Sequence, residues 1–345
     1  MKRVYLSLLL AACATAAFAQ GGFQPLIDLK PDKTVFLYAS DASSALKAID
    51  DPVVAKDVEC LALEVKEDCG ITNLERMVGD LGQICEINHT ARFDLYFPAD
   101  PNGKMVVICP GGGYQVVCTY GEGLYAAKWL ADRGITVAVA KHRMPNGHWT
   151  VPLDDMQEIF RYCRAHASEW NVNKIGVMGY SAGGHLAASV STLYVDAATR
   201  PDFTILFYPV ISLCEPFVEP GTRGNLLGKE EYWADRRNYS ADEYIARQQQ
   251  YDALKAYYSL EMRVDENTPM AFIVHGQADN VVPVQNSLDY YSRLSDCGVQ
   301  SELQIYDSPK HGFCFFPDEI ASHDWLAPQI RSSINNSLER WLKNL

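Results

Sequence analysis

Gly179-Tyr180-Ser181-Ala182-Gly183 is a Gly-x-Ser-x-Gly pattern, and its surroundings decide which fold the chain predicts. The run 174–178 before it is short and apolar, which indicates a strand, and residues 184–190 after it have the pattern of a helix. Ser181 therefore falls at a strand-to-helix turn, the place where a nucleophilic serine is held on a tight, strained turn. The Ala182 amide and the helix N-terminus then face the point where negative charge would develop.

Strands and helices are predicted to alternate on both sides of this turn. Residues 92–97 alternate with a period of two and residues 105–109 are apolar, so we interpret them as a hairpin joined by the turn 98–103. Further strands are expected at 135–140, 203–208, 270–274 and 301–306, and helices at 124–132, 153–169 and 284–294. This order predicts an α/β fold with a mostly parallel central sheet and helices on both faces.

A glycine-rich segment, Pro110-Gly111-Gly112-Gly113-Tyr114, follows the 105–109 strand. Consecutive glycines leave backbone amides unobstructed, as an oxyanion pocket requires. The alternative is an ordinary glycine-rich turn. The position of the segment, one strand-helix-strand unit before Ser181, favours amides of Gly112 and Gly113 as oxyanion donors.

A carboxylate and a histidine follow later strands. Asp279 lies in the loop after the 270–274 strand, where a carboxylate can orient an imidazole, although it could also form a turn or cap a helix. His311 lies beside Gly312 after the last strand and is the candidate general base. The chain order Ser181, Asp279, His311 is that of the α/β-hydrolase arrangement. His275 ends a buried strand and is interpreted as structural.

These ordered motifs make the chain resemble the α/β-hydrolase superfamily, specifically the secreted bacterial esterase and lipase group that includes acetyl xylan esterases and feruloyl esterase-like proteins. The similarity extends over residues 81–345. It implies a Ser181, His311 and Asp279 triad, an oxyanion hole of Ala182 with Gly112 or Gly113, and a small acylated substrate or acylated glycan. It implies neither a cofactor nor a metal. The chain has Cys109-Pro110 where many relatives carry a histidine before the glycines.

Residues 213–264, between two core strands, are longer than an ordinary connection and rich in tyrosine. We expect a helical insertion, or cap, before the penultimate strand. Its aromatic residues either contact the substrate or only pack helices onto the domain. Tyr114, Trp149 and Trp233 are the candidates for lining a substrate crevice.

The N-terminal region resembles an export signal. Met1-Lys2-Arg3, an apolar run and the ending Ala17-Phe18-Ala19 predict a signal peptide over residues 1–19, and hence a periplasmic or extracellular protein. The alternative is a lipoprotein anchored through Cys13. Residues 20–80, with strand candidates at 34–38 and 61–65, are interpreted as an extension packed on the main domain, with a small separate module as the alternative.

Composition excludes some functions. The 345 residues carry 30 basic and 43 acidic side chains, a net charge of −13, which argues against nucleic acid as a partner. After the leader, no stretch is apolar and long enough to span a membrane. The alternatives to a glycan esterase are a lipase or esterase of broad specificity, a prolyl-type exopeptidase and a non-enzymatic relative. Residues 1–80 are too few for the propeller that such peptidases carry.

Overall fold

The structure is a computed structural model. It describes residues 26–37, 76–78, 83–85, 87, 91–313, 315 and 326–345. Eight strands form one sheet in the order β1-β4-β7-β5-β8-β9-β10-β11. In chain order they are β1 (Lys33–Phe36), β4 (Arg92–Tyr96), β5 (Lys104–Cys109), β7 (Thr136–Lys141), β8 (Lys174–Tyr180), β9 (Thr204–Phe207), β10 (Ala271–Gly276) and β11 (Ser301–Tyr306). The predicted signal peptide and the strand candidate at 61–65 lie outside the described residues.

The sheet is parallel from β7 to β11 and antiparallel at its β1–β4 end. Its central strands are apolar and buried along almost their whole length, because helices cover both faces and neither side of these strands meets water. The mostly parallel sheet expected from the sequence is confirmed.

The expected hairpin of residues 92–97 and 105–109 is wrong. β4 pairs antiparallel with β7, and β7 lies between β4 and β5. Strands that are consecutive in sequence often pair, but here β5 hydrogen-bonds with two parallel partners, β7 and β8, so no edge is left for β4.

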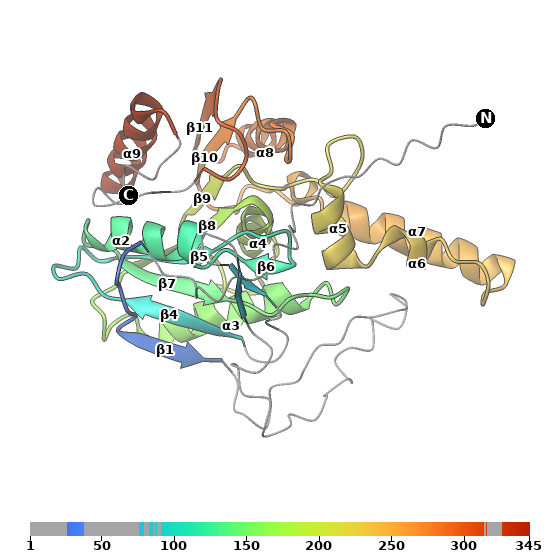
Figure 1. Cartoon of the computed structure of the whole chain (residues 1–345), viewed down its shortest axis with the longest axis horizontal. Coiled ribbons are helices and arrows are strands. Elements are labelled where there is room, and N and C mark those ends of the chain that lie inside the picture. Colours follow the sequence, from blue (N-terminus) through green and yellow to red (C-terminus); the bar gives the residue numbers. More distant parts are fainter. Residues whose placement is uncertain are drawn as a thin grey trace.

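Two helical layers enclose the sheet (Figure 1). The buried side chains of α3 (Val151–His166), α4 (Ser181–Thr192) and α8 (Gln285–Asp296) belong to one hydrophobic cluster, and those of α2 (Tyr125–Ala131) and α9 (Pro328–Lys343) to another. The sequence interpretation did not include α9. It is amphipathic, with buried Ile334, Leu338, Trp341 and Leu342 at helical spacing.

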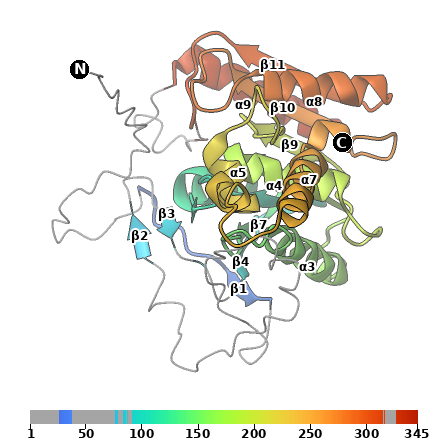
Figure 2. The same ribbon diagram turned by 90° about the vertical axis from the view of Figure 1, so that its right-hand side faces the viewer.

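The 213–264 segment forms a cap of three helices and a short turn between β9 and β10. These are α5 (Pro220–Leu227), α6 (Glu230–Trp233), α7 (Ala241–Tyr257) and η3 (Leu260–Met262). α7 begins with a capping box, in which Ser240 and Glu243 satisfy each other's backbone amides. Figure 1 shows α5, α6 and α7 beyond the ends of the strands, and Figure 2, turned to that side, shows α5 and α7 in front of α4.

A second, small sheet was not predicted. β2 (Arg76–Val78), β3 (Gln83–Cys85) and β6 (Val116–Val117) pair antiparallel in the order β2-β3-β6. β6 directly follows the glycine-rich segment, so this sheet continues the backbone that leaves the site described below. No helix of the described residues combines the length and apolarity needed to cross a membrane.

Candidate active site

Ser181 is the first residue of α4, directly after β8, and has a φ of 53°, a strained value for a residue with a side chain. Such a conformation costs about 1–3 kcal/mol and persists only where its surroundings impose it. A Cβ on Gly179 would lie 2.2 Å from the Gly183 carbonyl oxygen, and a Cβ on Gly183 would lie 2.1 Å from the Cys109 carbonyl oxygen. The two glycines are therefore what lets the turn fold so tightly.

Ser181, His311 and Asp279 are joined by hydrogen bonds, although 130 residues separate the first two along the chain. His311 Nε2 lies 2.8 Å from Ser181 Oγ, and His311 Nδ1 lies 2.7 Å from Asp279 Oδ2. An ionised carboxylate only accepts hydrogen bonds, so Nδ1–H donates to Asp279 and the bare Nε2 can accept the Ser181 proton. This is the geometry of a nucleophile, a base and the group that orients the base.

Asp279 is held as a carboxylate by its surroundings. Burial alone would raise its pKa, but hydrogen bonds from His275 and His311 and from the Val281 amide outweigh burial and hold the pKa well below its usual range. The Val281 and Val282 amides both donate to Oδ1 at 2.9 Å, so Oδ2 remains for His311. The side chain itself is completely buried. Asp279 therefore stays charged and fixed at neutral pH.

His275 lies behind this carboxylate. It is completely buried, and its Nε2 lies 3.1 Å from the Val282 carbonyl and 3.3 Å from Asp279 Oδ2. Both are acceptors, so Nε2 carries the proton and Nδ1 accepts from the Ser287 hydroxyl at 2.7 Å. The structure gives His275 no contact with Ser181.

The glycine-rich segment passes beside Ser181. Gly112 and Gly113 both have positive φ values, 129° and 63°, which glycine adopts without strain. The amides of Gly112, Gly113 and Ala182 have no hydrogen-bond partner among the described residues. Ala182 is the second residue of α4, where helix amides have no intrahelical acceptor. The structure thus leaves donors on both sides of Ser181.

A buried carboxylate, Glu122, was missed from the sequence. It lies in η2 (Tyr120–Leu124) and is 6% exposed. Its Oε2 accepts the Gly111 amide at 2.6 Å, and its Oε1 accepts the Tyr208 hydroxyl at 2.9 Å. Burial raises its pKa, while hydrogen bonds and the nearby His311 lower it in part. The signal was a lone acid, Gly121-Glu122-Gly123, at the start of a run that is otherwise apolar.

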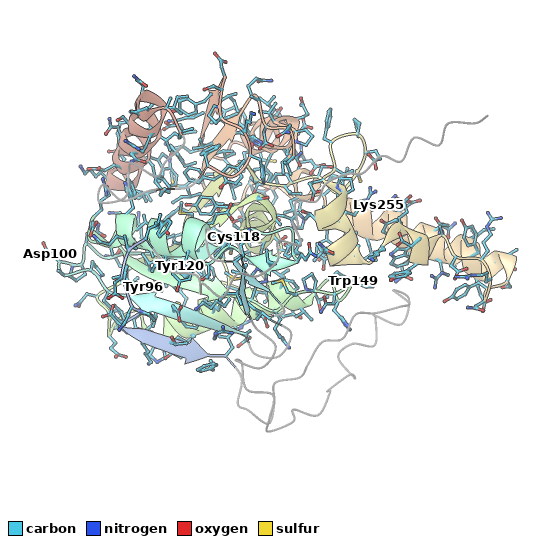
Figure 3. The ribbon with its side chains drawn as sticks, viewed as in Figure 1. Tyr96, Asp100, Cys118, Tyr120, Trp149 and Lys255 are labelled. Carbon is cyan, nitrogen blue, oxygen red and sulfur yellow. The ribbon has the colours of Figure 1, made fainter. Side chains whose placement is uncertain are left out.

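The three residues expected to line a crevice lie in different surroundings. Trp233 is completely buried, stacks on Tyr251 with centroids 4.9 Å apart, and donates its indole N–H to the Leu227 carbonyl. It therefore belongs to the core of the cap and offers no surface to a substrate. Tyr114 is 3% exposed and is turned inward. Trp149 is half-buried on the loop that leads into α3, near α5 (Figure 3).

The cap is tied to the glycine-rich segment through one residue of α5. Asn225 donates its side-chain amide to the Gly113 carbonyl at 2.8 Å. Its own carbonyl accepts the Gly147 amide at 3.0 Å, which also fixes the loop that carries Trp149. Cap, glycine segment and loop therefore meet around Asn225.

His185, four residues after Ser181 on α4, is completely buried beneath the site. Its Nε2 donates to the Tyr258 carbonyl at 2.9 Å, so its Nδ1 accepts from the Tyr114 hydroxyl at 3.0 Å. Burial lowers its pKa to about 4, although the hydrogen bond to the Tyr258 carbonyl offsets part of this effect. The ring is thus neutral in the folded protein and links α4 to the glycine segment and the cap.

This lowered pKa predicts a loss of stability in acid. The unfolded chain binds a proton on His185 below pH ~6.5, whereas the folded chain resists it down to about pH 4. The free energy of unfolding should therefore fall between these values, by at most about 1.4 kcal/mol per pH unit for this group. His185→Gln, which keeps a donor for the Tyr258 carbonyl, should reduce the fall.

The measurement is urea unfolding at neutral and mildly acid pH for wild type and variant. Burial lowers the pKa of His142 as well, so the pH dependence should be reduced and not abolished. Equal pH dependence in the two proteins would contradict this assignment.

No cluster of three or more His, Cys, Asp or Glu side chains within the described ranges is arranged to hold a metal ion. Five of the cysteines are free thiols: Cys109, Cys118, Cys163, Cys214 and Cys297.

Known proteins similar to this chain include hydrolases and esterases, in agreement with the geometry of the site. Residues 114–315 match a family described by the alpha/beta hydrolase fold. An acetylxylan esterase of Xylanibacter ruminicola is 34% identical over 258 residues, which cover 74% of this chain and 48% of that protein. An endo-1,4-beta-xylanase B of Butyrivibrio fibrisolvens is 30% identical over 246 residues, covering 65% of this chain and 34% of that protein. The chain therefore spans about half the length, or less, of these curated relatives.

Among solved structures, the acetyl ester-xyloside bifunctional hydrolase of Caldicellulosiruptor lactoaceticus superimposes with a TM-score of 0.58 at 29% identity. The match covers 74% of this chain and 88% of that one.

Proposed function

Because this chain belongs to the α/β-hydrolase family, we propose that it is a serine carboxylesterase that removes small acyl groups, acetyl above all, from plant-type polysaccharide or oligosaccharide. The observation that carries the proposal is the hydrogen-bonded series from Asp279 through His311 to Ser181. It lies at the strand ends where an α/β sheet binds its ligands, beside a glycine-rich segment with unengaged amides.

The first half of the reaction forms an acyl-enzyme. As Ser181 Oγ attacks the ester carbonyl carbon, its proton passes to His311 Nε2, and Asp279 stabilises the imidazolium through Nδ1–H. The carbonyl oxygen becomes an oxyanion, which accepts hydrogen bonds from the amides of Ala182 and of Gly112 or Gly113. The tetrahedral intermediate then collapses as the bond from the acyl carbon to the sugar oxygen breaks, and His311 gives its proton to that oxygen, which leaves as a sugar hydroxyl.

The second half returns the enzyme to its starting state. Water loses a proton to His311 and attacks the acyl carbonyl carbon, so that a second oxyanion forms in the same pocket. Its collapse breaks the bond to Ser181 Oγ, which takes the proton from His311. The carboxylic acid leaves, and the net reaction is ester plus water to acid plus alcohol.

Three observations support an acetylated glycan as substrate. The relative with 34% identity is an acetylxylan esterase, and the solved structure with 29% identity is an acetyl ester-xyloside hydrolase. The net charge of −13 suits a neutral substrate better than an anionic one. Trp149, half-buried on the loop that Asn225 ties to the cap, has an aromatic side chain of the kind that stacks on sugar rings.

The proposal includes the export signal predicted for residues 1–19, because polysaccharide substrates lie outside the cell membrane. Cell fractionation with detection of the processed chain tests it. Recovery of the unprocessed chain in the cytoplasm would contradict it.

The activity is tested on a panel of substrates. Purified protein should release acetate from acetylated xylo-oligosaccharide and none from the same material after chemical deacetylation. On p-nitrophenyl esters, kcat/KM should be highest for acetate and should fall as the acyl chain lengthens. Preference for long acyl chains, for feruloylated sugars or for aminoacyl-prolyl amides would each contradict the proposed substrate.

A further inference from the structure

The proposed triad does not account for Glu122, a carboxylate that lies between the glycine-rich segment and Tyr208. Its carboxylate is buried next to the site, and its contacts are a backbone amide, a phenol hydroxyl and the thiol of Cys118. A buried carboxylate is costly to desolvate unless several hydrogen bonds hold it. Cys118, labelled in Figure 3, is the residue directly after β6.

One oxygen of this carboxylate holds the glycine-rich segment. Oε2 accepts the Gly111 amide at 2.6 Å, and the amides of Gly112 and Gly113 follow directly along the chain. A Cβ on Gly111 would lie 2.7 Å from Oε2 and 3.0 Å from Ser181 Cβ. Glu122, the segment and the serine are thus in direct contact, with no room for an intervening group.

The other oxygen holds Tyr208, the residue directly after β9. Tyr208 has a φ of 37°, an unfavourable conformation for an aromatic residue. Its ring meets the His311 ring edge-on, with centroids 4.8 Å apart, and it also contacts Phe313. The Glu122 hydrogen bond therefore fixes a strained residue against the ring of the candidate base.

We propose that Glu122 and Tyr208 are positioning residues: a single carboxylate fixes the segment that holds the oxyanion and, through the Tyr208 hydroxyl, the ring against which His311 rests. The inference rests on the proposed esterase function. It makes the geometry of the base and that of the oxyanion pocket depend on one shared group. Neither residue contacts the substrate in this account.

The test separates the two contacts. Tyr208→Phe keeps the ring and removes the hydroxyl, and Glu122→Leu keeps a side chain of similar size but removes both acceptor oxygens. Each should lower kcat on p-nitrophenyl acetate by about 10- to 100-fold, because small displacements of reacting groups are costly, while KM changes by less than about 2-fold. The double variant should be no worse than the worse single variant, because both changes break one linkage.

Tyr290→Phe is the matched control. Tyr290 is also completely buried, on α8, and its hydroxyl has no hydrogen-bond partner among the described residues. This variant should keep the wild-type kcat, and thermal unfolding should show that every protein tested is folded. If Glu122→Leu does not fold, Tyr208→Phe decides alone.

Wild-type kcat in both single variants would overturn the inference, as would losses that multiply in the double variant. Failure of the proposed function is distinguishable. If wild-type protein hydrolyses no ester, the rate at which a fluorophosphonate labels Ser181 replaces kcat, because labelling uses His311 and the glycine segment with no natural substrate. Slower labelling in both variants then supports the positioning role, and equal labelling, or none in any protein, overturns it.

Discussion

Replacing Ser181 by alanine should lower kcat on p-nitrophenyl acetate by about a million-fold, to the background that oxyanion binding alone can sustain. The hydroxyl is the only group of this side chain that can form the acyl bond, and it lies 2.8 Å from its candidate base. Alanine also removes no buried charge and fits the same turn, so the protein should remain folded. Initial rates and thermal unfolding measure the two effects separately.

Ser189→Ala is the control for this experiment. Ser189 lies on the same helix, is buried, and donates its hydroxyl only within the helix, to the His185 carbonyl at 2.8 Å. It should keep wild-type activity. Most of the activity surviving in Ser181→Ala would show that another residue is the nucleophile.

Asp279→Asn should lower kcat by about 10 000-fold with little change in KM. The asparagine carbonyl can still accept from the Val281 and Val282 amides, so its NH₂ group would face His311 Nδ1. Nδ1 must then accept, the proton moves to Nε2, and His311 can no longer take the Ser181 proton. The loss arises from the wrong tautomer and requires no change in position.

Asp296→Asn, an exposed carboxylate at the end of α8, is the matched control and should be silent. Steady-state kinetics on p-nitrophenyl acetate compare the variants. A loss of less than about 10-fold in Asp279→Asn, with folding intact, would remove Asp279 from the orienting role.

The sequence located most of the sheet because its strands are buried on both faces and read as short apolar runs separated by helices. The same pattern placed Ser181, Asp279 and His311 at strand ends. The carboxyl ends of parallel strands share one edge of a sheet, so three distant positions could be expected to meet. Their catalytic roles remain predictions until tested.

Strand order could not be predicted in the same way. The apolar pattern of 92–97 and 105–109 says that both are strands but not which strand each one pairs with. Pairing depends on the crossover through η2 and α2, which brings β7 between them. Helix α9 is not among the predicted elements, because its four buried residues are spread over a polar sequence and form no continuous apolar run.

Tertiary contacts account for the other differences. Trp233 and a substrate-lining tryptophan look alike in sequence, and only the stacking on Tyr251 shows that Trp233 fills the cap. Glu122 has no motif of its own, and its role depends on Gly111 and Tyr208, which are brought to it by different strands.

The central claim is that Ser181 is the nucleophile of a serine hydrolase. Its most direct test is to react the protein with a fluorophosphonate and to locate the adduct by peptide mass spectrometry. The account predicts one adduct, on Ser181. It should not form when the protein is denatured before the reaction, and it should form much more slowly in His311→Ala. An unmodified Ser181 in protein that still hydrolyses esters would contradict it.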